Sequence, residues 1–397
     1  MINKTVKKVA IVTSHPIQYQ IPLFRAISTQ SDIDLTVYFG CDYGINPTKV
    51  HPGFGKAFAW DIPLLDGYKH IFLKNSKADV EVNDWRLDGP ELKSYFQSNQ
   101  YDAVIVFGWN KVLFWQAIFL AKKYKISLIL RAESNLNHTQ SLQTKVIKGL
   151  LFPLFFKQFD AFMSIGSHNS KLYRYYGVKN SVIYNAPYCV DNDFFAQGAI
   201  NSEIKAEQLR SNLGISNTDT VFLFMAKFID RKRPLDLIAA AAKNRKYQNF
   251  HVILVGGGDL MEDCQDAIIN NRLNNVHLVG FVNQTELPVY YAAADVFVLP
   301  SQYETWGLVL NEAMACGLPG IVSNACGAAY DMIIDGKTGY SYTMGDVEKL
   351  SKLMVYMSNS LDNCKKMGQQ ATKHVQNFSI PIVVSALKNI LQDICKK

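Results

Sequence analysis

The 397-residue sequence is too long for one ordinary hydrophobic core, and at about 150 residues per domain it predicts two or three domains. Apolar residues make up 48% of the chain, which excludes an intrinsically disordered protein. No apolar run reaches 18 uncharged residues, and the basic start is followed by only a short apolar stretch without a cleavage site. We therefore expect neither a transmembrane helix nor a signal peptide.

The net charge of +7 is unevenly distributed. Residues 1–190 hold 22 Lys and Arg against 13 Asp and Glu, whereas residues 191–397 hold 19 against 21. This surplus suits the first half to anionic partners such as a lipid surface, a pyrophosphate-linked acceptor or nucleic acid; a solvated lysine-rich surface is the alternative. The seven cysteines are scattered without C-x2-C spacing, which argues against disulfides and structural zinc and indicates a reducing, cytoplasmic compartment.

The first half alternates apolar runs with helical patterns. Helices are expected near residues 21–29 and over the stretch VLFWQAIFLAKKY. Because the apolar runs are short and almost uninterrupted, they are typical of parallel strands buried on both faces. The expected strands are 9–14, 33–40, 101–108, 126–134, 159–166 and 180–187.

The same alternation restarts after a polar stretch at residues 190–215. A helix with Pro234 in its first turn follows the first new strand. We therefore predict an α/β protein with two doubly wound domains, 1–195 and 205–375, and a helix in 376–397 that packs back toward the N-terminal domain. The expected strands of the second domain are 220–228, 250–258, 275–281, 295–301 and 319–325.

Several groups follow strand ends in the second domain, where ligands of open α/β sheets bind. The segment KFIDRKR brings four cations after the first strand, and Gly256, Gly257 and Gly258 follow the second. Glycines at such a turn let the backbone approach a ligand closely. The cationic side chains are Lys227, Arg231, Lys232 and Arg233.

The segment ETWGLVLNEAMACGLPG, residues 304–320, predicts a loop that leads into a helix from about Gly307 to Cys316. The free N–H groups from Thr305 to Leu308 form an anion site, which the helix dipole strengthens. Glu304 and Glu312 are separated by about 12 Å of helix at 1.5 Å per residue. A sugar, a diphosphate and a ribose laid along this helix would meet both carboxylates, so the segment predicts a nucleotide-sugar site.

Residues 220–342 resemble the C-terminal half of the family-four glycosyltransferases. The similar strings are FLFMAKFIDRKRPLDLI, ILVGGGDL, VHLVGFVNQTELPVYYAAADVFVLPS, ETWGLVLNEAMACGLPGIVS and DGKTGY. The resemblance implies the GT-B architecture, with two Rossmann-like domains and an interdomain cleft, and a retaining reaction. In the first half, SHPIQYQIPLF and LILRAES are similar to a subgroup common in bacterial surface-polysaccharide synthesis.

The resemblance also implies roles for residues of the second domain. Lys227, where the family usually has arginine, and Lys232 would hold the donor diphosphate, and Glu304 would contact the donor sugar; these three are the expected catalytic residues. Glu312 would bind the ribose. Further donor contacts are expected from Thr305, at a usual glycine position, and from Trp306, Gly307, Leu308, Gly257, Phe281 and Val282.

The acceptor side is expected in the first domain. Ser14, His15 and Gln18 follow the first strand and face the cleft in this fold. The histidine that the family places near the donor sugar has no clear match, and Glu133 with Ser134 stands in its place.

These features predict a metal-independent retaining glycosyltransferase without a cofactor, of the hexosyl- or N-acetylhexosaminyltransferase type, in polysaccharide or lipopolysaccharide synthesis. We expect a UDP- rather than a GDP-sugar donor, a glycan or lipid-diphosphate-linked acceptor, peripheral contact with the anionic inner membrane, and no nucleic acid. Two alternatives remain: a GT-B nucleotide-sugar epimerase, which would turn over the donor alone, and a non-catalytic binding protein.

Three other features have competing interpretations. Asp191-Asn192-Asp193 has the D-x-D spacing of metal–diphosphate sites but lies in the predicted linker. Residues 145–158, KVIKGLLFPLFFKQ, predict either a helix that docks on an anionic membrane or a buried core helix. His138 and His168 are interpreted as ordinary polar loop residues.

Overall fold

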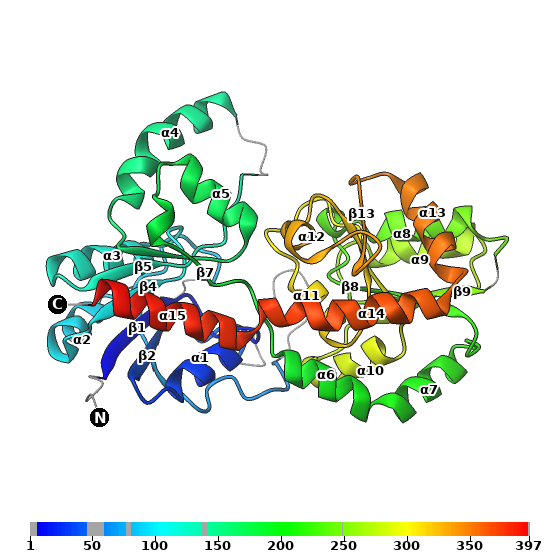
Figure 1. Ribbon diagram of the computed structural model, residues 1–397, viewed down its shortest axis with the longest axis horizontal. Helices are drawn as coiled ribbons and strands as arrows, with labels where there is room; N and C mark the ends of the chain where they lie inside the picture. The colour runs from blue at the N-terminus through cyan, green and yellow to red at the C-terminus, as the bar shows by residue number, and fades with distance from the viewer. Residues whose placement is uncertain (1–5, 46–58, 77–80, 137–140, 248, 396–397) are drawn as a thin grey trace. The chain divides into compact units, whose positions relative to one another are not determined.

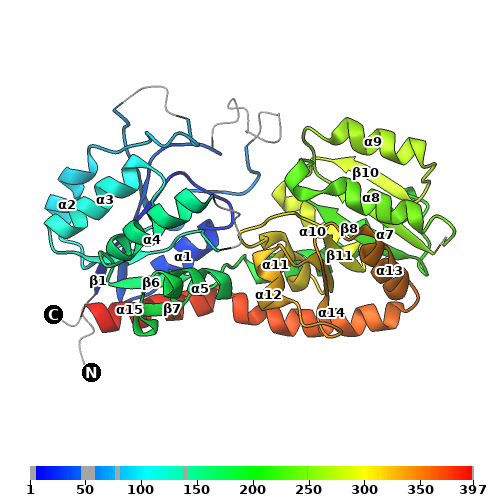
Figure 2. The same cartoon turned by 90° about the horizontal axis from the view of Figure 1, so that it is seen from above.

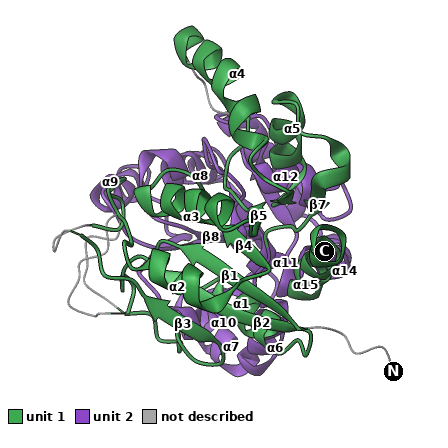
Figure 3. Ribbon diagram, turned by 90° about the vertical axis from the view of Figure 1, so that its left-hand side faces the viewer, with its two compact units in different colours: residues 1–49, 58–188, 380–397 green, residues 50–57, 189–379 purple. Residues whose placement is uncertain are grey.

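The computed structural model describes residues 6–45, 59–76, 81–136, 141–247 and 249–395, and the chain forms two compact units (Figure 1 and Figure 3). The first unit contains the described residues up to Tyr188 and those from Ile380 onward, and the second contains residues 189–379. The chain thus enters the second unit a few residues before the predicted boundary at 195 and leaves it shortly after the predicted boundary at 376.

The first unit is built on a seven-stranded sheet in the order β3-β2-β1-β4-β5-β6-β7, in which all pairs are parallel. β1 lies near the centre, and Val9 pairs with Leu35 on one side and Ala103 on the other. The strands are β1 (Lys7–Thr13), β2 (Ile33–Phe39), β3 (Lys69–Phe72), β4 (Ala103–Val106), β5 (Ser127–Leu130), β6 (Ala161–Ser164) and β7 (Ile183–Asn185), and the helices are α1 (Ile21–Ser28), α2 (Leu92–Asn99), α3 (Val112–Lys123), α4 (Leu142–Phe156) and α5 (Ser167–Tyr175).

The last helix, α15 (Ile380–Ile394), belongs to this first unit and packs on α1, β6 and β7 (Figure 1 and Figure 2). Polar contacts hold the C-terminal half of this helix on the unit. Tyr184 Oη donates to Asp393 Oδ2 at 2.7 Å, and Lys388 pairs with Asp32 at 3.1 Å. The helix therefore completes a unit whose strands all come from the first half of the chain.

The second unit has a six-stranded parallel sheet in the order β10-β9-β8-β11-β12-β13. Its strands are β8 (Thr220–Met225), β9 (Phe250–Val255), β10 (Val276–Gly280), β11 (Val296–Leu299), β12 (Gly320–Ser323) and β13 (Gly339–Tyr342). The helices are α6 (Asn192–Asn201), α7 (Glu203–Asn212), α8 (Pro234–Lys243), α9 (Met261–Asn270), α10 (Leu287–Ala292), α11 (Leu308–Ala315), α12 (Gly327–Met332), α13 (Val347–Ser358) and α14 (Leu361–Val375).

The predicted pair of doubly wound α/β sheets is confirmed, and the central strands β4, β8 and β11 are buried along their whole length. Two edge strands, β3 and β13, were not predicted. Both have only four residues, with the sequences KHIF and GYSY, so they lack the continuous apolar run that marks a central strand.

Asp191 has a structural role at the start of α6. Its carboxylate accepts a hydrogen bond from the backbone N–H of Phe194 at 3.0 Å and thereby caps the helix. Asn192, the middle residue of the D-x-D sequence, is buried and donates to the carbonyl of Val375 at 3.4 Å. Asp191 and Asn192 thus have structural contacts at the start of α6.

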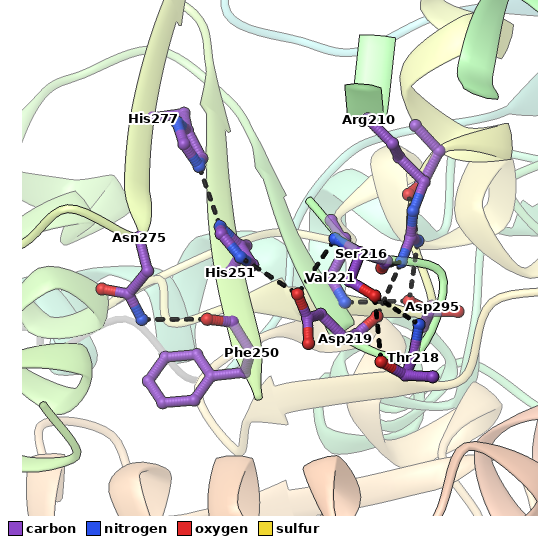
Figure 4. Close-up of polar contacts among 11 residues, drawn as sticks. Arg210, Ser216, Thr218, Asp219, Val221, Phe250, His251, Asn275, His277 and Asp295 are labelled. Atoms are coloured by element: carbon purple, nitrogen blue, oxygen red, sulfur yellow. Dashed lines mark hydrogen bonds and ion pairs between the residues drawn. The ribbon is translucent and has the colours of Figure 1, made fainter. Parts of the chain in front are cut away.

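A network of polar contacts connects the amino ends of β8, β9 and β10 to one another (Figure 4). Asp219 Oδ2 accepts from the backbone N–H of Ser216 at 3.0 Å and lies 3.5 Å from His251 Nε2. His251 Nδ1 lies 3.0 Å from His277 Nε2 on the next strand. Burial and the neighbouring His251 lower the pKa of His277 from 6.5 to about 4. The network lies at the end of the strands opposite to the one where ligands of such sheets bind.

This lowered pKa makes the stability of the protein depend on pH. Between pH 6.5 and 4 the unfolded chain binds a proton at His277 that the folded chain does not, so the free energy of unfolding falls as pH falls through this window. We expect His277→Gln to flatten this dependence by up to about 1.4 kcal/mol per pH unit. Urea unfolding of both proteins at pH 4.5, 5.5, 6.5 and 7.5 measures the slopes, and parallel slopes would contradict the assignment.

Candidate functional site

Three cations gather at the carboxyl end of β8, the central strand of the second unit. Lys227 follows the strand directly, and Arg231 and Lys232 lie in the short turn of residues Asp230–Lys232. Burial lowers the pKa of Lys227, and the charges of Lys232 and Arg231 lower it further. The three like charges are therefore close enough to disfavour one another, and a bound anion would relieve this repulsion.

The fourth predicted cation, Arg233, has a structural role. Its guanidinium makes a two-bond contact with Asp236, with Nε 2.6 Å from Oδ2 and Nη2 2.9 Å from Oδ1. Arg233 also has a left-handed backbone, with φ of 53°, which starts α8. This pair holds Arg233 at the end of the turn, so the remaining cluster of cations consists of Lys227, Arg231 and Lys232.

Glu304 contacts this cluster directly. Its Oε1 accepts hydrogen bonds from Lys232 Nζ and, at 3.1 Å, from Ser301 Oγ. The Lys232 and Glu304 side chains are only 14% and 9% exposed. Lys232, which was predicted to bind phosphate, and Glu304, which was predicted to bind the sugar, thus form a nearly buried ion pair with each other. The sequence did not predict this contact.

The loop that carries Glu304 is held against the start of α12. The carbonyl of Glu304 accepts from the N–H of Gly327 at 3.1 Å, and the carbonyl of Trp306 accepts from the N–H of Ala328 at 2.9 Å. Gly327 allows this approach, because a Cβ there would lie 2.1 Å from the carbonyl oxygen of Thr305. Helix α11 then begins at Leu308, after Gly307 with φ of 108°. The expected loop leading into a helix is present, with Thr305 to Leu308 at its start.

The side chain of Trp306 does not face a ligand site. It is buried, its Nε1 donates to Asn311 Oδ1 at 2.8 Å, and its ring centroid lies 5.7 Å from that of Phe378. Any contact of Trp306 with a donor would therefore come from its backbone.

The glycine turn after β9 contains two different kinds of position. A Cβ at Gly256 would lie 1.9 Å from the carbonyl oxygen of Ala226, and one at Gly258 would lie 2.7 Å from that of Phe228. Both have φ near 145°. At Gly257, by contrast, no heavy atom of the described residues lies within 4 Å of such a Cβ. Gly256 and Gly258 are required by the packing of the turn, and Gly257 alone faces open space where a ligand can approach the backbone.

Glu312, on α11, is buried and its Oε2 accepts a hydrogen bond from Tyr291 Oη of α10 at 2.7 Å. Burial raises the pKa of Glu312 to about 7, and the bond from Tyr291 opposes this rise. Tyr291 is a polar partner that the sequence did not reveal, because the stretch YYAAADVF has the pattern of ordinary core residues. Phe281 and Val282, the expected base contacts, follow β10 and are half-buried.

The first unit has a pocket of about 410 Å³ at the carboxyl ends of β1, β4 and β5. Three of the four acceptor candidates, Ser14, His15 and Glu133, line it, whereas Gln18, in the described turn after β1, does not. Ser14 Oγ is hydrogen-bonded to His15 Nδ1 at 2.8 Å. Glu133 Oε1 accepts from Tyr19 Oη at 2.9 Å. Expected residues from two strand ends are thus brought together in one cavity.

Sequence reasoning missed two residues of this pocket. Lys111 is only 8% exposed, its Nζ donates to the carbonyls of Val82 and Asp84, the latter at 3.2 Å, and burial lowers its pKa. Gln20 is 6% exposed, and among the described residues nothing donates to its buried Oε1. A buried acceptor in a pocket wall needs a donor from water or ligand. Gln20 immediately precedes α1 and Lys111 immediately precedes α3, and one polar residue at the start of a helix gives little signal.

In a comparison with family models, residues 205–374 match the family described as "Glycosyl transferases group 1". These residues form a group 1 glycosyltransferase domain. All the donor-side candidates, from Lys227 to Glu312, lie within it, whereas the pocket of the first unit lies outside the matched residues.

Curated relatives support the same assignment. The chain is 29% identical over 194 residues to N-acetyl-alpha-D-glucosaminyl L-malate synthase of Bacillus anthracis, covering 48% of this chain and 49% of that protein. It is 27% identical to alpha-monoglucosyldiacylglycerol synthase of Acholeplasma laidlawii, over 51% and 50%. The chain thus spans about half the length of these relatives.

Solved structures show the same architecture over the whole chain. A glycosyltransferase from Rickettsia africae superposes with a TM-score of 0.76 at 16% identity, covering 99% of each chain. Anabaena HepE in complex with UDP gives a TM-score of 0.74 at 18% identity, covering 98% of this chain and 100% of the other. The group 1 domain therefore belongs to a chain with the GT-B fold, as the sequence predicted.

The two kinds of glycine in the turn after β9 give a matched pair of variants. We expect Gly256→Ala to destabilise the group 1 domain by at least about 2 kcal/mol, because its Cβ meets the Ala226 carbonyl and its backbone conformation is strained. Gly257→Ala should change stability by less than about 1 kcal/mol. Urea unfolding measures both, and equal effects of the two substitutions would contradict this description of the turn.

Proposed function

We propose that the protein is a retaining glycosyltransferase that transfers a hexosyl or N-acetylhexosaminyl group from a nucleotide sugar to a glycan or lipid-linked glycan in surface-polysaccharide synthesis. The observation that carries the proposal is the cluster of Lys227, Arg231 and Lys232 beside the buried carboxylate of Glu304, within a group 1 glycosyltransferase domain. This arrangement offers positive charge for a diphosphate next to an acceptor for sugar hydroxyls.

The ion pair suggests how donor binding prepares the site. A diphosphate arriving at the cationic cluster replaces Glu304 as the partner of Lys232, because two or more phosphate charges attract the ammonium group more strongly than one carboxylate. Glu304 is then released to accept hydrogen bonds from hydroxyls of the donor sugar. Because binding of the phosphate by Lys232 frees Glu304, it promotes binding of the sugar by Glu304.

The reaction that this site would support needs no nucleophile from the enzyme. The bond between the anomeric carbon and the β-phosphate oxygen of the donor breaks, and a bond from the acceptor oxygen to that carbon forms on the same face. The acceptor proton passes to a donor phosphate oxygen. Lys227, Lys232 and the N–H groups at the start of α11 stabilise the negative charge that develops on the leaving diphosphate.

Related proteins support the donor and acceptor classes. The Anabaena HepE structures contain UDP or UDP-glucose, and WaaB is named as a lipopolysaccharide outer core galactosyltransferase. We accordingly propose a UDP-sugar donor, a lipid-diphosphate-linked or polysaccharide acceptor bound by the pocket of the first unit, and action at the cytoplasmic side of the membrane. No cofactor beyond the nucleotide sugar enters the proposal.

The first experiment is a thermal-shift screen of the protein with UDP- and GDP-sugars, followed by incubation of the stabilising donor with and without oligosaccharide acceptors. We expect release of the nucleoside diphosphate to accelerate with acceptor, and NMR of the product to show the anomeric configuration of the donor. Conversion of the donor into an isomeric nucleotide sugar without acceptor would instead identify an epimerase. Inverted configuration in the product would disprove the retaining reaction.

Lys232→Ala tests the phosphate assignment. We expect turnover to fall about 100-fold or more, the loss measured when a key oxyanion donor is removed. Lys243→Ala is the matched control, since Lys243 is an exposed lysine at the end of α8 that pairs with Glu348. Steady-state kinetics on both variants give the comparison, and near-normal turnover of Lys232→Ala would remove this lysine from the mechanism.

Glu312 and Tyr291 test the ribose assignment. Glu312→Ala should weaken UDP binding about tenfold, because it removes a charged acceptor of hydroxyl hydrogen bonds. Tyr291→Phe keeps the carboxylate but removes a bond that lowers its pKa, so that pKa should rise above about 7. Calorimetry should then show weak UDP binding at pH 7 that recovers at pH 8.5. Unchanged UDP affinity in Glu312→Ala would exclude this role.

A further inference from the structure

Helix α4 presents an apolar face to solvent. In Figure 1 and Figure 3 it stands out from the rest of its own unit. Leu142 is 80% exposed and Leu150 is 70% exposed. At 100° per residue the exposed apolar side chains fall on one half of the helix. The set is Leu142, Val146, Ile147, Leu150, Leu151 and Leu154, hereafter the α4 face.

The opposite side of α4 holds the helix on its unit. Phe152, Phe155 and Phe156 lie in its last turns, and each ring centroid is within 6 Å of that of Trp109. Phe155 also contacts the ring of Trp115 on α3, at 5.1 Å, and Trp115 and Phe119 are exposed. The α4 face is therefore not needed for packing of α4 in its unit, and the core-helix interpretation of residues 145–158 is wrong for its outward side.

The part of the chain that contains α4 is strongly basic, although two of its cations, Lys111 and Arg131, are buried. Residues 111–179 contain eleven Lys and Arg but only two Asp and Glu, which accounts for the whole charge surplus of the first half. Lys145, Lys148 and Lys157 lie on or beside α4, and Lys122 and Lys123 end α3. Because two copies meeting through this face would bring like charges together, an anionic partner fits better than a second copy.

We propose that the α4 face docks on an anionic lipid bilayer, with the apolar side chains at the depth of the acyl chains and the lysines at the headgroups. Within the described part of the chain, no helix is long and apolar enough to cross a bilayer, so α4 lies in the interface. This surface is independent of the donor chemistry in the second unit.

The docked helix also adjoins the pocket of the first unit. Trp109 lines that pocket, and the same ring packs on Phe152, Phe155 and Phe156 of α4. If the proposed transferase function holds, this arrangement favours an acceptor whose headgroup enters the pocket while its lipid stays in the membrane that α4 touches.

The test is flotation of the full chain with vesicles of phosphatidylcholine containing 30% phosphatidylglycerol, and with vesicles of phosphatidylcholine alone. We expect binding to the anionic vesicles, and a fall of about tenfold or more in Leu150→Gln/Leu154→Gln. Ile204→Gln/Ile269→Gln is the matched control, because both isoleucines are exposed on helices of the second unit. Binding of Leu150→Gln/Leu154→Gln equal to that of the unaltered protein would overturn the proposal.

Charge is tested separately with Lys145→Gln/Lys157→Gln, which should lose about fivefold in vesicle binding per lysine at low salt and less at high salt. Sedimentation velocity without vesicles tests the alternative that a second copy of the chain covers the α4 face. A dimer that Leu150→Gln/Leu154→Gln dissociates, together with no vesicle binding, would show that the face joins two copies and would refute membrane docking. None of these measurements uses a nucleotide sugar, so their failure is distinguishable from failure of the proposed transferase activity.

Discussion

The contact between Lys232 and Glu304 is the interaction on which the proposed chemistry depends. Both side chains are nearly buried, and each would be costly to desolvate without the other. The contact is possible only because two separate segments are fixed in place: the turn after β8, and the loop before α11 that Gly327 allows to pack closely. In the proposed mechanism this pair, with a further lysine and an arginine nearby, exchanges partners when the more strongly charged diphosphate binds.

The fold of the second unit was predictable from sequence because its strands are buried, and its candidate site residues were found because they follow the strand ends. Buried parallel strands give continuous apolar runs, and Lys227, Gly257 and Glu304 follow three of these runs directly. What could not be predicted is which polar groups pair with one another. Arg233 pairs with Asp236 three residues further along, a helical spacing that is visible in the sequence but does not show that this pair forms. Tyr291 of α10 donates to Glu312 of α11, and this contact leaves no trace in spacing or composition.

Helix α4 shows a different limit of sequence reasoning. Its apolar residues cover most of its circumference, so periodicity alone does not show which side faces protein. Only the ring contacts of Phe152 and Phe155 with Trp109 identify the inner side. The pocket next to them illustrates the same point, since Gln20 and Lys111 precede different helices and line one pocket only because of the sheet order.

The position of α15 has a consequence for how the chain is made. The first unit is interrupted by the whole of the second, and its closing helix, α15, is synthesised only after the second unit. During synthesis the second unit is therefore complete while the strands of the first still lack the cover that α15 provides over β6 and β7. A nascent chain in this state exposes apolar sheet surface, which makes the first unit the part that needs protection from aggregation until α15 has been synthesised.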